Sequence, residues 1–448
     1  MKLRFQSFDG RRSLRIADCL RLCLIFLLSG ILFEPSALLA QRSSAQAGLP
    51  DQQTVQMLLD RIEKLEARVA QLEATSQQQP SVPVSPVPAS PSTTEPAVTT
   101  TQAETPMSER MDVSKTLLRM RGFGDVNFHG SNRKGDNTSF TLGQLNLFVT
   151  SDISDKFKFL SEIVFEGGPD NIYGTTRGQA NNFAVDLERL LLQYSHNDYF
   201  NLAVGRYHTA IGYYNTAYHH STWFQTTEER PFVFNFEDRG GILPIHNVGA
   251  SASGLIPSGS LGLHYVAEIG NGRDSRTPLD DEPVQNVVDE NNHKAFNFAF
   301  FSRPEAVHGL QAGFSVYHDL LAPANSPNVA ETILAAHAVL IRPHFEWLNE
   351  ALAIRHSQQG IHHLFETPAF YTQVSKQFGA YRPYFRYQYV NASSREPIFP
   401  DVGLRQGPSV GIRYDASEFV AVKLQYDYTT LRRQPAVNSL GLQVGFTF

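Results

Sequence analysis

Residues 209–246 hold the densest group of side chains that could do chemistry. The group consists of His219, His220, Glu228, Glu229, Arg230, Glu237, Asp238 and Arg239. Acidic and basic groups that face each other across a narrow gap create a transverse electric field, which sorts solutes by charge and dipole. The alternative for this stretch is an aromatic-rich loop that caps the outside of a domain.

The paired histidines His219-His220 and His362-His363 raise the question of a metal site. Neighbouring side chains on a strand point to opposite faces, so neither pair chelates a metal unless the backbone turns. The spacing indicates ordinary loop histidines, and the sequence predicts no metal site and no cofactor. It contains neither a G-x-S-x-G nor an H-E-x-x-H motif, and the stretch 130–137 lacks phosphate-loop spacing, so no enzyme activity is expected.

The composition narrows the class of protein. Charged residues make up 18% of the 448 residues, below the roughly 25% of ordinary soluble domains, and Gly and Phe each occur 31 times. The net charge of −6 shows no strong bias, so no nucleic-acid partner is expected. The sequence has no apolar run of about 18 residues, and it therefore predicts no membrane-spanning helix.

Residues 1–47 have the features of an export signal peptide. An apolar run at 22–33 precedes small residues at 37–40 and again at 45–47, so two cleavage sites remain open. The only two cysteines, Cys19 and Cys23, lie in this segment, and the mature chain is therefore expected to have no thiol or disulfide. The basic residues before the apolar run are Arg11, Arg12, Arg15 and Arg21.

Residues 51–75 carry a heptad pattern. Apolar residues recur at alternating spacings of three and four, which predicts a short coiled coil. The alternative is a single amphipathic helix packed on a domain. The next stretch, 76–117, is rich in Pro, Ser and Thr and is expected to be a semi-extended linker without a core. The heptad residues are Val55, Leu58, Ile62, Leu65, Val69 and Leu72.

From residue 118 to the end, apolar and polar residues alternate. In "FVAVKLQYDYT", for example, Val422, Leu424 and Tyr426 share one parity, while Lys423 and Gln425 share the other. Side chains on a strand alternate faces, so each such segment predicts a strand with one apolar face and one polar face. Charged polar faces and aromatic-edged apolar faces are typical of membrane barrels rather than of buried sandwich cores.

Short and long connections alternate along this region. The expected short turns are 151–155, 196–198, 256–259, 303–309, 342–344, the join near Gly379, and 415–418; the expected long loops are 130–139, 166–183, 209–246, 270–292, 319–331, 357–366, 391–404 and 431–437. The pattern predicts an all-β fold, a transmembrane antiparallel up-and-down β-barrel of about sixteen strands over residues 118–448, with loops outside and turns in the periplasm.

Two of the expected strands break the alternation. Residues 184–195 place Glu188 beside Arg189 and mix the two parities, and residues 247–255 consist mostly of small side chains. Either segment is a candidate for contact with a neighbouring subunit instead of lipid.

The chain ends "LGLQVGFTF", in which Leu440, Leu442, Val444, Phe446 and Phe448 share one parity. This strand resembles the assembly signal of Gram-negative outer-membrane barrels, which implies that the barrel assembly machinery reads it by strand pairing. The barrel region resembles a general porin. It is most similar to the phosphate-selective porin O and P family through residues 201–218, and the preceding coiled coil is similar to that of the sucrose porin.

The resemblance implies a trimeric pore in the bacterial outer membrane, surrounded by lipid, through which small hydrophilic solutes diffuse passively. It also implies that the third external loop, 209–246, folds inward and constricts the channel. The alternative function is structural: a barrel with a plugged pore that anchors a periplasmic coiled-coil stalk to peptidoglycan. The heptad residues favour a coiled coil of two helices. An interface between barrels can bury more surface than this short coiled coil, so we expect a homotrimer.

Parity also predicts which charged side chains line the pore. They are Arg119, Arg121, Lys158, Glu162, Arg382, Arg386, Arg413 and Lys423. The inner faces of all the expected strands carry two further basic residues, Lys156 and Arg355. The acidic residues expected on these faces are Asp125, Glu162, Glu166, Glu268, Asp319, Asp415 and Asp427. This surplus of bases is small, and it predicts at most a mild preference for anions.

Overall fold

The computed structural model of this protein describes residues 117–167, 183–218, 222–236, 241–275, 289–324 and 326–448. The predicted signal peptide (1–47) and coiled coil (51–75), and nearly all of the predicted linker (76–117), lie outside the described residues. Among the described residues, no helix is both long enough and apolar enough to cross a membrane.

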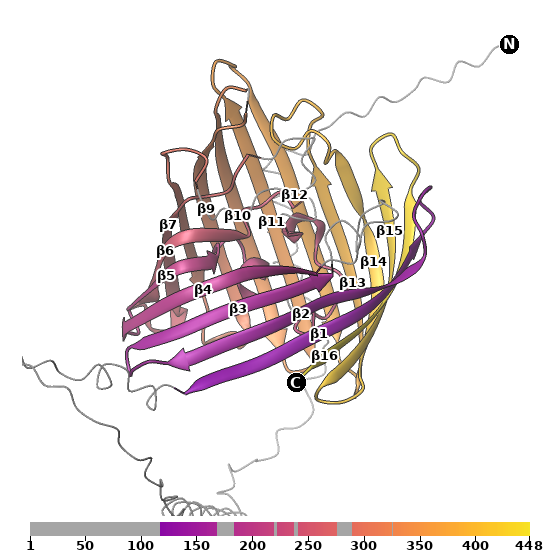
Figure 1. Ribbon diagram of the computed structural model, residues 1–448, viewed down its shortest axis with the longest axis horizontal. Helices are drawn as coiled ribbons and strands as arrows, with labels where there is room; N and C mark the ends of the chain where they lie inside the picture. The colour runs from indigo at the N-terminus through magenta and orange to yellow at the C-terminus, as the bar shows by residue number, and fades with distance from the viewer. Residues whose placement is uncertain (1–116, 168–182, 219–221, 237–240, 276–288, 325) are drawn as a thin grey trace, which may run out of the picture. The chain divides into compact units, whose positions relative to one another are not determined.

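The described chain forms a closed β-barrel of sixteen strands, as predicted (Figure 1). Each strand pairs antiparallel with its sequence neighbours, and the last strand pairs with the first. The strands are β1 (Leu118–Ser131), β2 (Ser139–Asp152), β3 (Phe157–Gly167), β4 (Phe183–Asn197), β5 (Phe200–His208), β6 (His246–Ile256), β7 (Leu263–Gly270), β8 (Ala295–Ser302), β9 (Leu310–Leu321), β10 (Val329–Arg342), β11 (Phe345–Gln358), β12 (Leu364–Lys376), β13 (Tyr381–Asn391), β14 (Leu404–Asp415), β15 (Val420–Leu431) and β16 (Val437–Thr447).

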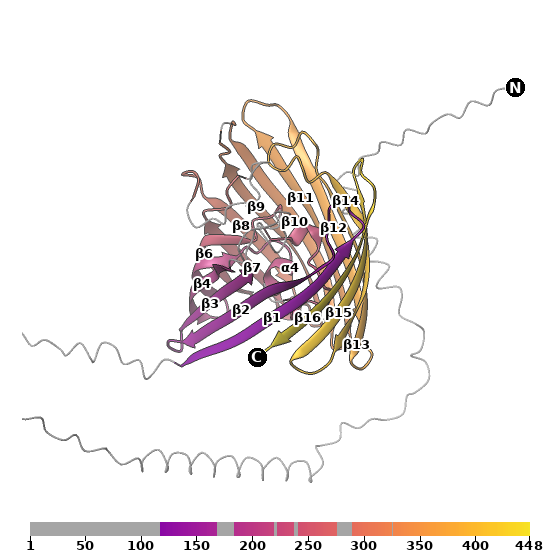
Figure 2. The same ribbon diagram turned by 45° about the vertical axis from the view of Figure 1, so that its right-hand side comes forward.

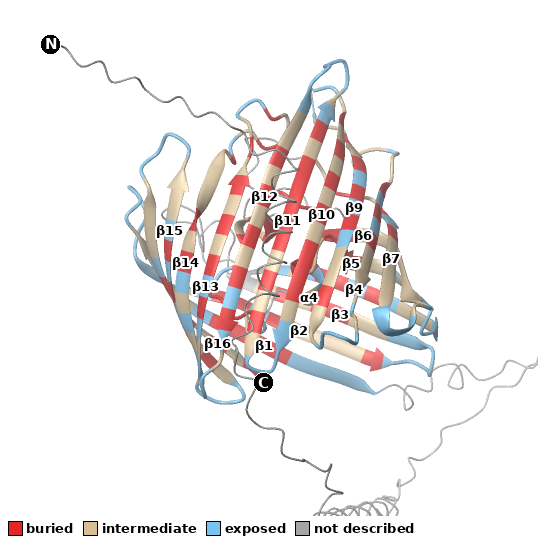
Figure 3. Ribbon diagram, turned by 180° about the vertical axis from the view of Figure 1, so that it is seen from behind, coloured by how far each residue is buried: buried red, intermediate tan, exposed pale blue. Residues whose placement is uncertain are grey.

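Side chains alternate between the two faces of the barrel wall. On β15, Leu424 and Tyr426 are 43% and 46% exposed on the outer face, whereas Lys423 and Gln425 are fully buried on the inner face. Figure 3 shows the same alternation of buried and partly exposed positions along β10, β11 and β12. The barrel therefore turns its apolar side chains outward and its polar ones inward, as the parity of the sequence predicts.

The barrel closes where β1 meets the C-terminal residues. The Phe448 amide donates to the Gly122 carbonyl (3.0 Å), and the Gly122 amide donates to the Phe448 carbonyl (2.9 Å). The rings of Phe448 and Phe446 lie over Gly122 and Gly124, where a Cβ atom would come within 2.3 and 2.7 Å of the ring atoms. The two glycines on β1 thus leave room for the terminal aromatic rings, and these rings cover the closing strand pair.

A β-bulge explains the irregular pattern in β4. Ile163 pairs with Leu187, and Glu162 pairs with Arg189, so Glu188 is the additional residue on the bulged strand. Both Glu188 and Arg189 are buried, with exposed fractions of 2% and 8%. The extra residue shifts the alternation by one, and it allows an adjacent acid and base to enter the barrel interior together.

The connections follow the predicted alternation of short turns and long loops. The longest connection, between β5 and β6, contains α4 (Tyr214–Ala217) and the 3-10 turn η3 (Phe232–Phe234); a second 3-10 turn, η5 (Gly259–Leu261), lies between β6 and β7. In Figure 2, α4 lies within the ring of strands. The long connection therefore enters the barrel.

The outward apolar face predicts a depth-dependent cost for a charged residue. Leu424→Arg, in the middle of β15, should lower the free energy of unfolding in lipid by about 2–4 kcal/mol, because an arginine there meets hydrocarbon. Val420→Arg shares the same face but lies at the end of β15, and it should cost about 0–1 kcal/mol. Urea unfolding in vesicles measures both values. Equal costs at the two positions would contradict a lipid-facing outer surface.

Candidate pore constriction

The described residues of the connection 209–245, called the inner loop, cross the interior of the barrel. At its start, the Ala210 amide donates to Glu268 Oε2 on β7 (3.0 Å), and the Gly212 amide donates to Ser315 Oγ on β9 (3.3 Å). These contacts join residues far apart in the sequence. The loop therefore leaves the end of β5 and lies against the inner wall.

A single carboxylate on β11 anchors the first part of the inner loop. The two oxygens of Glu350 accept hydrogen bonds from the amides of Tyr213 (2.6 Å) and Tyr214 (2.9 Å), and the Tyr371 hydroxyl also donates to Glu350 (2.6 Å). Glu350 is only 1% exposed. A carboxylate that accepts three donors in a buried site makes charge-assisted bonds, which are stronger than neutral ones.

Glu346 lies four residues before Glu350 on the same face of β11, and it contacts a later part of the inner loop. Its carboxylate accepts hydrogen bonds from the Tyr218 hydroxyl (3.2 Å) and the Thr226 hydroxyl (3.3 Å), and from the Gln373 side-chain amide on β12 (2.8 Å). The two acids on the same face of β11 thus hold the inner loop at two points.

Basic side chains hold the far side of the inner loop through its carbonyl groups. Arg413 on β14 donates to the carbonyl of Trp223 (2.7 Å), Arg386 on β13 donates to that of Glu229 (2.8 Å), and Lys423 on β15 donates to that of Thr227 (3.0 Å). Loop amides therefore meet wall acids on one side, and loop carbonyls meet wall bases on the other. This arrangement satisfies buried backbone groups that have no strand partner.

The structure describes three of the eight residues predicted to line a constriction. Glu229 is exposed, whereas Glu228 and Arg230 are buried. Arg230 packs within the loop itself: its Nε donates to the Phe234 carbonyl (2.7 Å), and its guanidinium lies 4.0 Å from the centre of the Phe236 ring. His219, His220, Glu237, Asp238 and Arg239 lie outside the described residues.

Burial and nearby charges change the acidity of two inner-loop side chains. Desolvation, together with the neighbouring Glu229 carboxylate, raises the pKa of Glu228 well above its usual range. Desolvation also raises the pKa of Tyr214 to about 12, so its hydroxyl stays protonated and donates to Gln225 Oε1 (2.5 Å). The interior of the loop therefore disfavours additional negative charge.

The predicted pore-lining residues all have inward parity, but they fall into two groups. Near the short-turn end, Arg119 and Lys158 are more than half exposed and lie 3.0 and 3.8 Å from Asp152. Arg382 and Arg121 are paired there with Gln377 and Thr447. In contrast, Glu162, Arg386 and Lys423 are fully buried, so they hold internal contacts and do not face open water.

Glu162 belongs to a set of buried ion pairs that sequence parity found only in part. It lies 2.6 Å from Arg189, and Glu188 contacts Arg206 (3.4 Å) and His246 (3.0 Å). In the sequence, parity indicated Glu162, and the break in alternation at Glu188 and Arg189 was the other signal for this set. Their partners lie on the neighbouring strands β3 and β5 and on β6.

A second buried network draws two more loops inward. Arg273, after β7, forms a bidentate pair with Glu331 on β10, and His356 on β11 bonds both Glu331 (2.8 Å) and Glu396. Glu396 belongs to the connection between β13 and β14, and it also accepts the amide of Ile398 (2.9 Å). This network could not be predicted from the sequence because loop contacts have no periodic signal.

One of the basic residues expected on the inner face, Arg355, lies on the outer face. Arg355 has outward parity on β11, and it pairs with Glu366 on the neighbouring strand (3.2 Å). Among the described residues, eleven buried acids stand against six buried arginines and lysines. The acids absent from the sequence-based count are Glu188, Glu228, Glu331, Glu346, Glu350 and Glu396.

Part of the barrel interior is filled by an apolar cluster. The inner loop contributes Tyr214, Phe234 and Ile245, and the connection between β13 and β14 contributes Ile398 and Phe399. They pack against inward side chains of β8 to β13. The cluster leaves less of the cross-section to water than a barrel of this size would otherwise provide.

Comparisons with known proteins add no functional information. No family model and no curated protein sequence matches the chain. Solved structures with a similar fold include the outer membrane channel DcaP of Acinetobacter baumannii (11% identity, 75% of this chain and 98% of that one, TM-score 0.49). Another is OmpF of Salmonella typhi in complex with daunomycin (10% identity, 74% of this chain and 97% of that one, TM-score 0.49). A third is OprB of Pseudomonas putida (9% identity, 74% of this chain and 94% of that one, TM-score 0.49). The fold assignment itself rests on the strand pairing.

The contacts of Glu350 predict a local change when its carboxylate is removed. Glu350→Ala should speed hydrogen exchange at the amides of Tyr213 and Tyr214 by roughly 10- to 150-fold, because each loses a charged acceptor that contributes about 1.5–3 kcal/mol. Exchange detected by mass spectrometry measures this change. Glu418→Ala, in the exposed turn after β14, is the matched control. Unchanged exchange in Glu350→Ala would contradict the role of Glu350 as an anchor.

Proposed function

We propose that this protein is an outer-membrane porin, a channel for the passive diffusion of small hydrophilic solutes. The observation that carries this proposal is the inner loop, which crosses a closed sixteen-strand barrel and bonds to wall side chains on β7, β9, β11, β13, β14 and β15. A barrel of sixteen strands is wide enough for a water-filled channel, and an inward loop reduces it to the size of small solutes.

The outer surface supports a membrane location. Its exposed side chains include Leu190, Phe314, Val410, Leu424 and Tyr426, which come from strands around the barrel. Most strands contain at least nine residues, and about 9–11 tilted residues suffice to cross a bilayer. We infer that the long-loop end faces outward and that the short-turn end, where the chain enters and leaves the barrel, faces the periplasm.

The constriction lies, in this proposal, between the inner loop and the wall of β1 to β4. Glu229 is the exposed charged side chain of the described loop segment, and Arg119 and Lys158 supply exposed positive charge near the short-turn end. The five undescribed loop residues predicted for the constriction remain part of the proposal. Charges of both signs along a narrow path select solutes by charge and dipole.

The charges of the interior give no support for an anion preference. The mild anion preference expected from the sequence depended on a surplus of bases, and the buried acids of the interior outnumber the bases. The resemblance to phosphate-selective porins rests on residues 201–218, of which only Arg206 carries a positive charge, and it lies beside Glu188. We therefore do not extend phosphate selectivity to this chain.

A structural role is the second candidate function, and the apolar cluster favours it. A barrel whose interior is filled by loop residues such as Phe234 and Phe399 could serve as an anchor for the N-terminal segment. In that proposal, the signal peptide is removed, the coiled coil contacts peptidoglycan from the periplasm, and residues 76–117 span the distance. An anchor does not need to conduct ions.

The assembly state and biogenesis are also proposals. The small outward residues of β6, Ala250 and Ala252, provide a surface on which a neighbouring barrel could approach closely in a homotrimer. The outward residues of β16 and the terminal Phe448 carry the pattern that the barrel assembly machinery would recognise. Mass measurement of the detergent-solubilised protein tests the trimer.

Conductance in planar lipid bilayers distinguishes the two functions. The porin proposal predicts stepwise ohmic conductance from the purified full-length protein. The absence of conductance from correctly folded barrels would contradict the porin proposal and favour the anchor.

A matched pair of arginine substitutions tests which charges face the pore. Arg119→Gln should increase the potassium-to-chloride permeability ratio by roughly two- to fivefold. The reason is that a unit charge interacts with a monovalent ion 4–8 Å away in water by about 0.5–1 kcal/mol. Arg355→Gln removes the same charge from the outer face and should leave the ratio unchanged. If Arg355→Gln changes the ratio and Arg119→Gln does not, the proposed pore path is wrong.

A further inference from the structure

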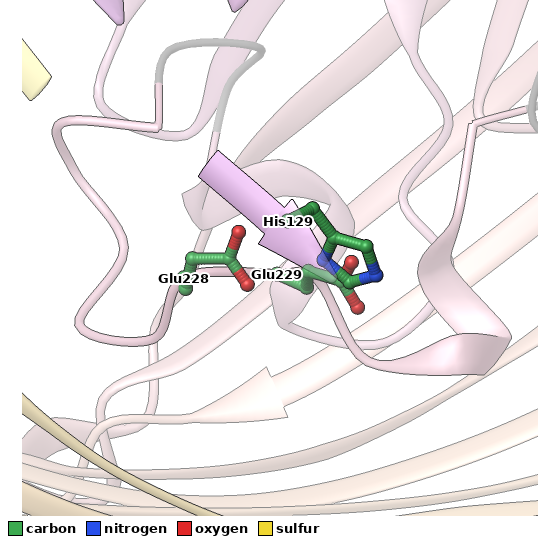
Figure 4. Close-up of side chains that lie close together, drawn as sticks. All are labelled: His129, Glu228 and Glu229. Carbon is green, nitrogen blue, oxygen red and sulfur yellow. The ribbon is translucent and has the colours of Figure 1, made fainter. Parts of the chain in front are cut away.

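Three potential metal ligands meet where the inner loop approaches β1. His129 lies near the loop end of β1, and Glu228 and Glu229 belong to the inner loop. One donor atom from each side chain lies within 4.8 Å of the other two. Figure 4 shows the carboxylate of Glu228 directed towards the other two side chains. The cluster combines a strand and a loop that are about a hundred residues apart in the sequence.

The position of Glu228 gives an independent reason to expect a ligand. Glu228 is 6% exposed, and its Oε2 atom is buried without a hydrogen-bond partner. A buried carboxylate oxygen without a partner loses its hydration and gains nothing in return, which is costly. The amide of the same residue is bonded to Tyr384 and Gln425, so the backbone that carries the carboxylate is held in place.

The wall beside His129 is shaped to admit this carboxylate. Gly441 on β16 is the strand partner of His129 on β1. A Cβ atom on Gly441 would lie 2.6 Å from Glu228 Oε2, so any larger residue would displace the carboxylate. The absent side chain leaves the space that brings Glu228 next to the imidazole.

We propose that His129, Glu228 and Glu229 bind a divalent transition-metal ion of the zinc type. Imidazole nitrogen and carboxylate oxygen are both donors that zinc accepts, and three protein ligands with water in the fourth position are the arrangement of an open zinc site. Ligands of a tetrahedral zinc ion lie about 3.4 Å apart when the bonds are about 2.1 Å, so small side-chain rotations bring the three donors to binding distance. The imidazole ligand favours a transition metal over calcium or magnesium.

The ion would connect the inner loop to β1, which lies outside the group of strands whose side chains hold the loop. The wall side chains that hold the loop come from β7 to β15, whereas His129 is on β1. The neighbouring Lys423, which would oppose a cation, already donates to the carbonyls of Thr222 and Thr227 and to Gln443. Bound metal would thus fix the loop from the opposite side.

Calorimetric titration of the full-length, detergent-solubilised and chelator-treated protein with zinc chloride tests this site. It does not require the channel to conduct, so its outcome is separate from that of the proposed function. We expect one site, and we expect His129→Ala and Glu229→Gln each to weaken zinc binding at least tenfold. His362→Ala, which removes an exposed histidine elsewhere, is the control and should bind zinc as the unchanged protein does.

The controls exclude misfolding and a non-specific carboxylate site. Glu229 is exposed, so Glu229→Gln should keep the thermal unfolding temperature of the metal-free protein. Calcium chloride in the same titration should bind at least tenfold more weakly than zinc. Zinc binding that survives both substitutions, zinc binding lost only in His362→Ala, or the absence of any zinc binding would overturn the proposal.

Discussion

The whole structure depends on the closure of the sheet between β1 and β16. A sheet that spans a membrane cannot leave an unpaired edge, because hydrocarbon offers no hydrogen bonds to free backbone groups. Here the last residue completes the ring: Phe448 and Gly122 exchange two backbone hydrogen bonds, and the terminal rings cover two glycines of β1. Once the sheet is closed, strand alternation separates an apolar outer surface from a polar interior.

The polar interior then sets a second constraint, because a loop that enters it must satisfy its own backbone. Glu350 accepts two consecutive loop amides, and Arg386 and Arg413 donate to loop carbonyls on the other side. These side chains replace the strand partners that a buried loop lacks. The same charges that hold the loop also determine the field in the remaining channel, so loop position and ion selectivity are physically linked.

The fold could be predicted from the sequence because its signal is periodic and local. Alternation along β15, and the regular change between short and long connections, are enough to give the strand number and the face of Leu424 and Gln425. The interior could be predicted only in part. Parity fails at the β4 bulge, where one inserted residue moves Arg189 to the inner face, and it also misassigned Arg355.

Contacts between distant loops and the wall could not be predicted, because they depend on three-dimensional position. Nothing in the spacing of Glu346 and Glu350 indicates that they hold the loop after β5, and nothing links Arg273 with Glu331 and Glu396. The sequence identifies the charged residues of 209–246 as a group. It does not distinguish Arg230, which packs inside the loop, from Glu229, which is exposed.

We propose that the barrel is an open channel narrowed by its inner loop. Liposome swelling with neutral sugars of increasing size tests this claim most directly, because neutral solutes report pore width independently of charge. We expect rapid swelling with a monosaccharide and a steep decline towards trisaccharides and tetrasaccharides. Liposomes that contain folded protein but do not swell even with a monosaccharide would contradict it, because the interior would then be closed to solutes.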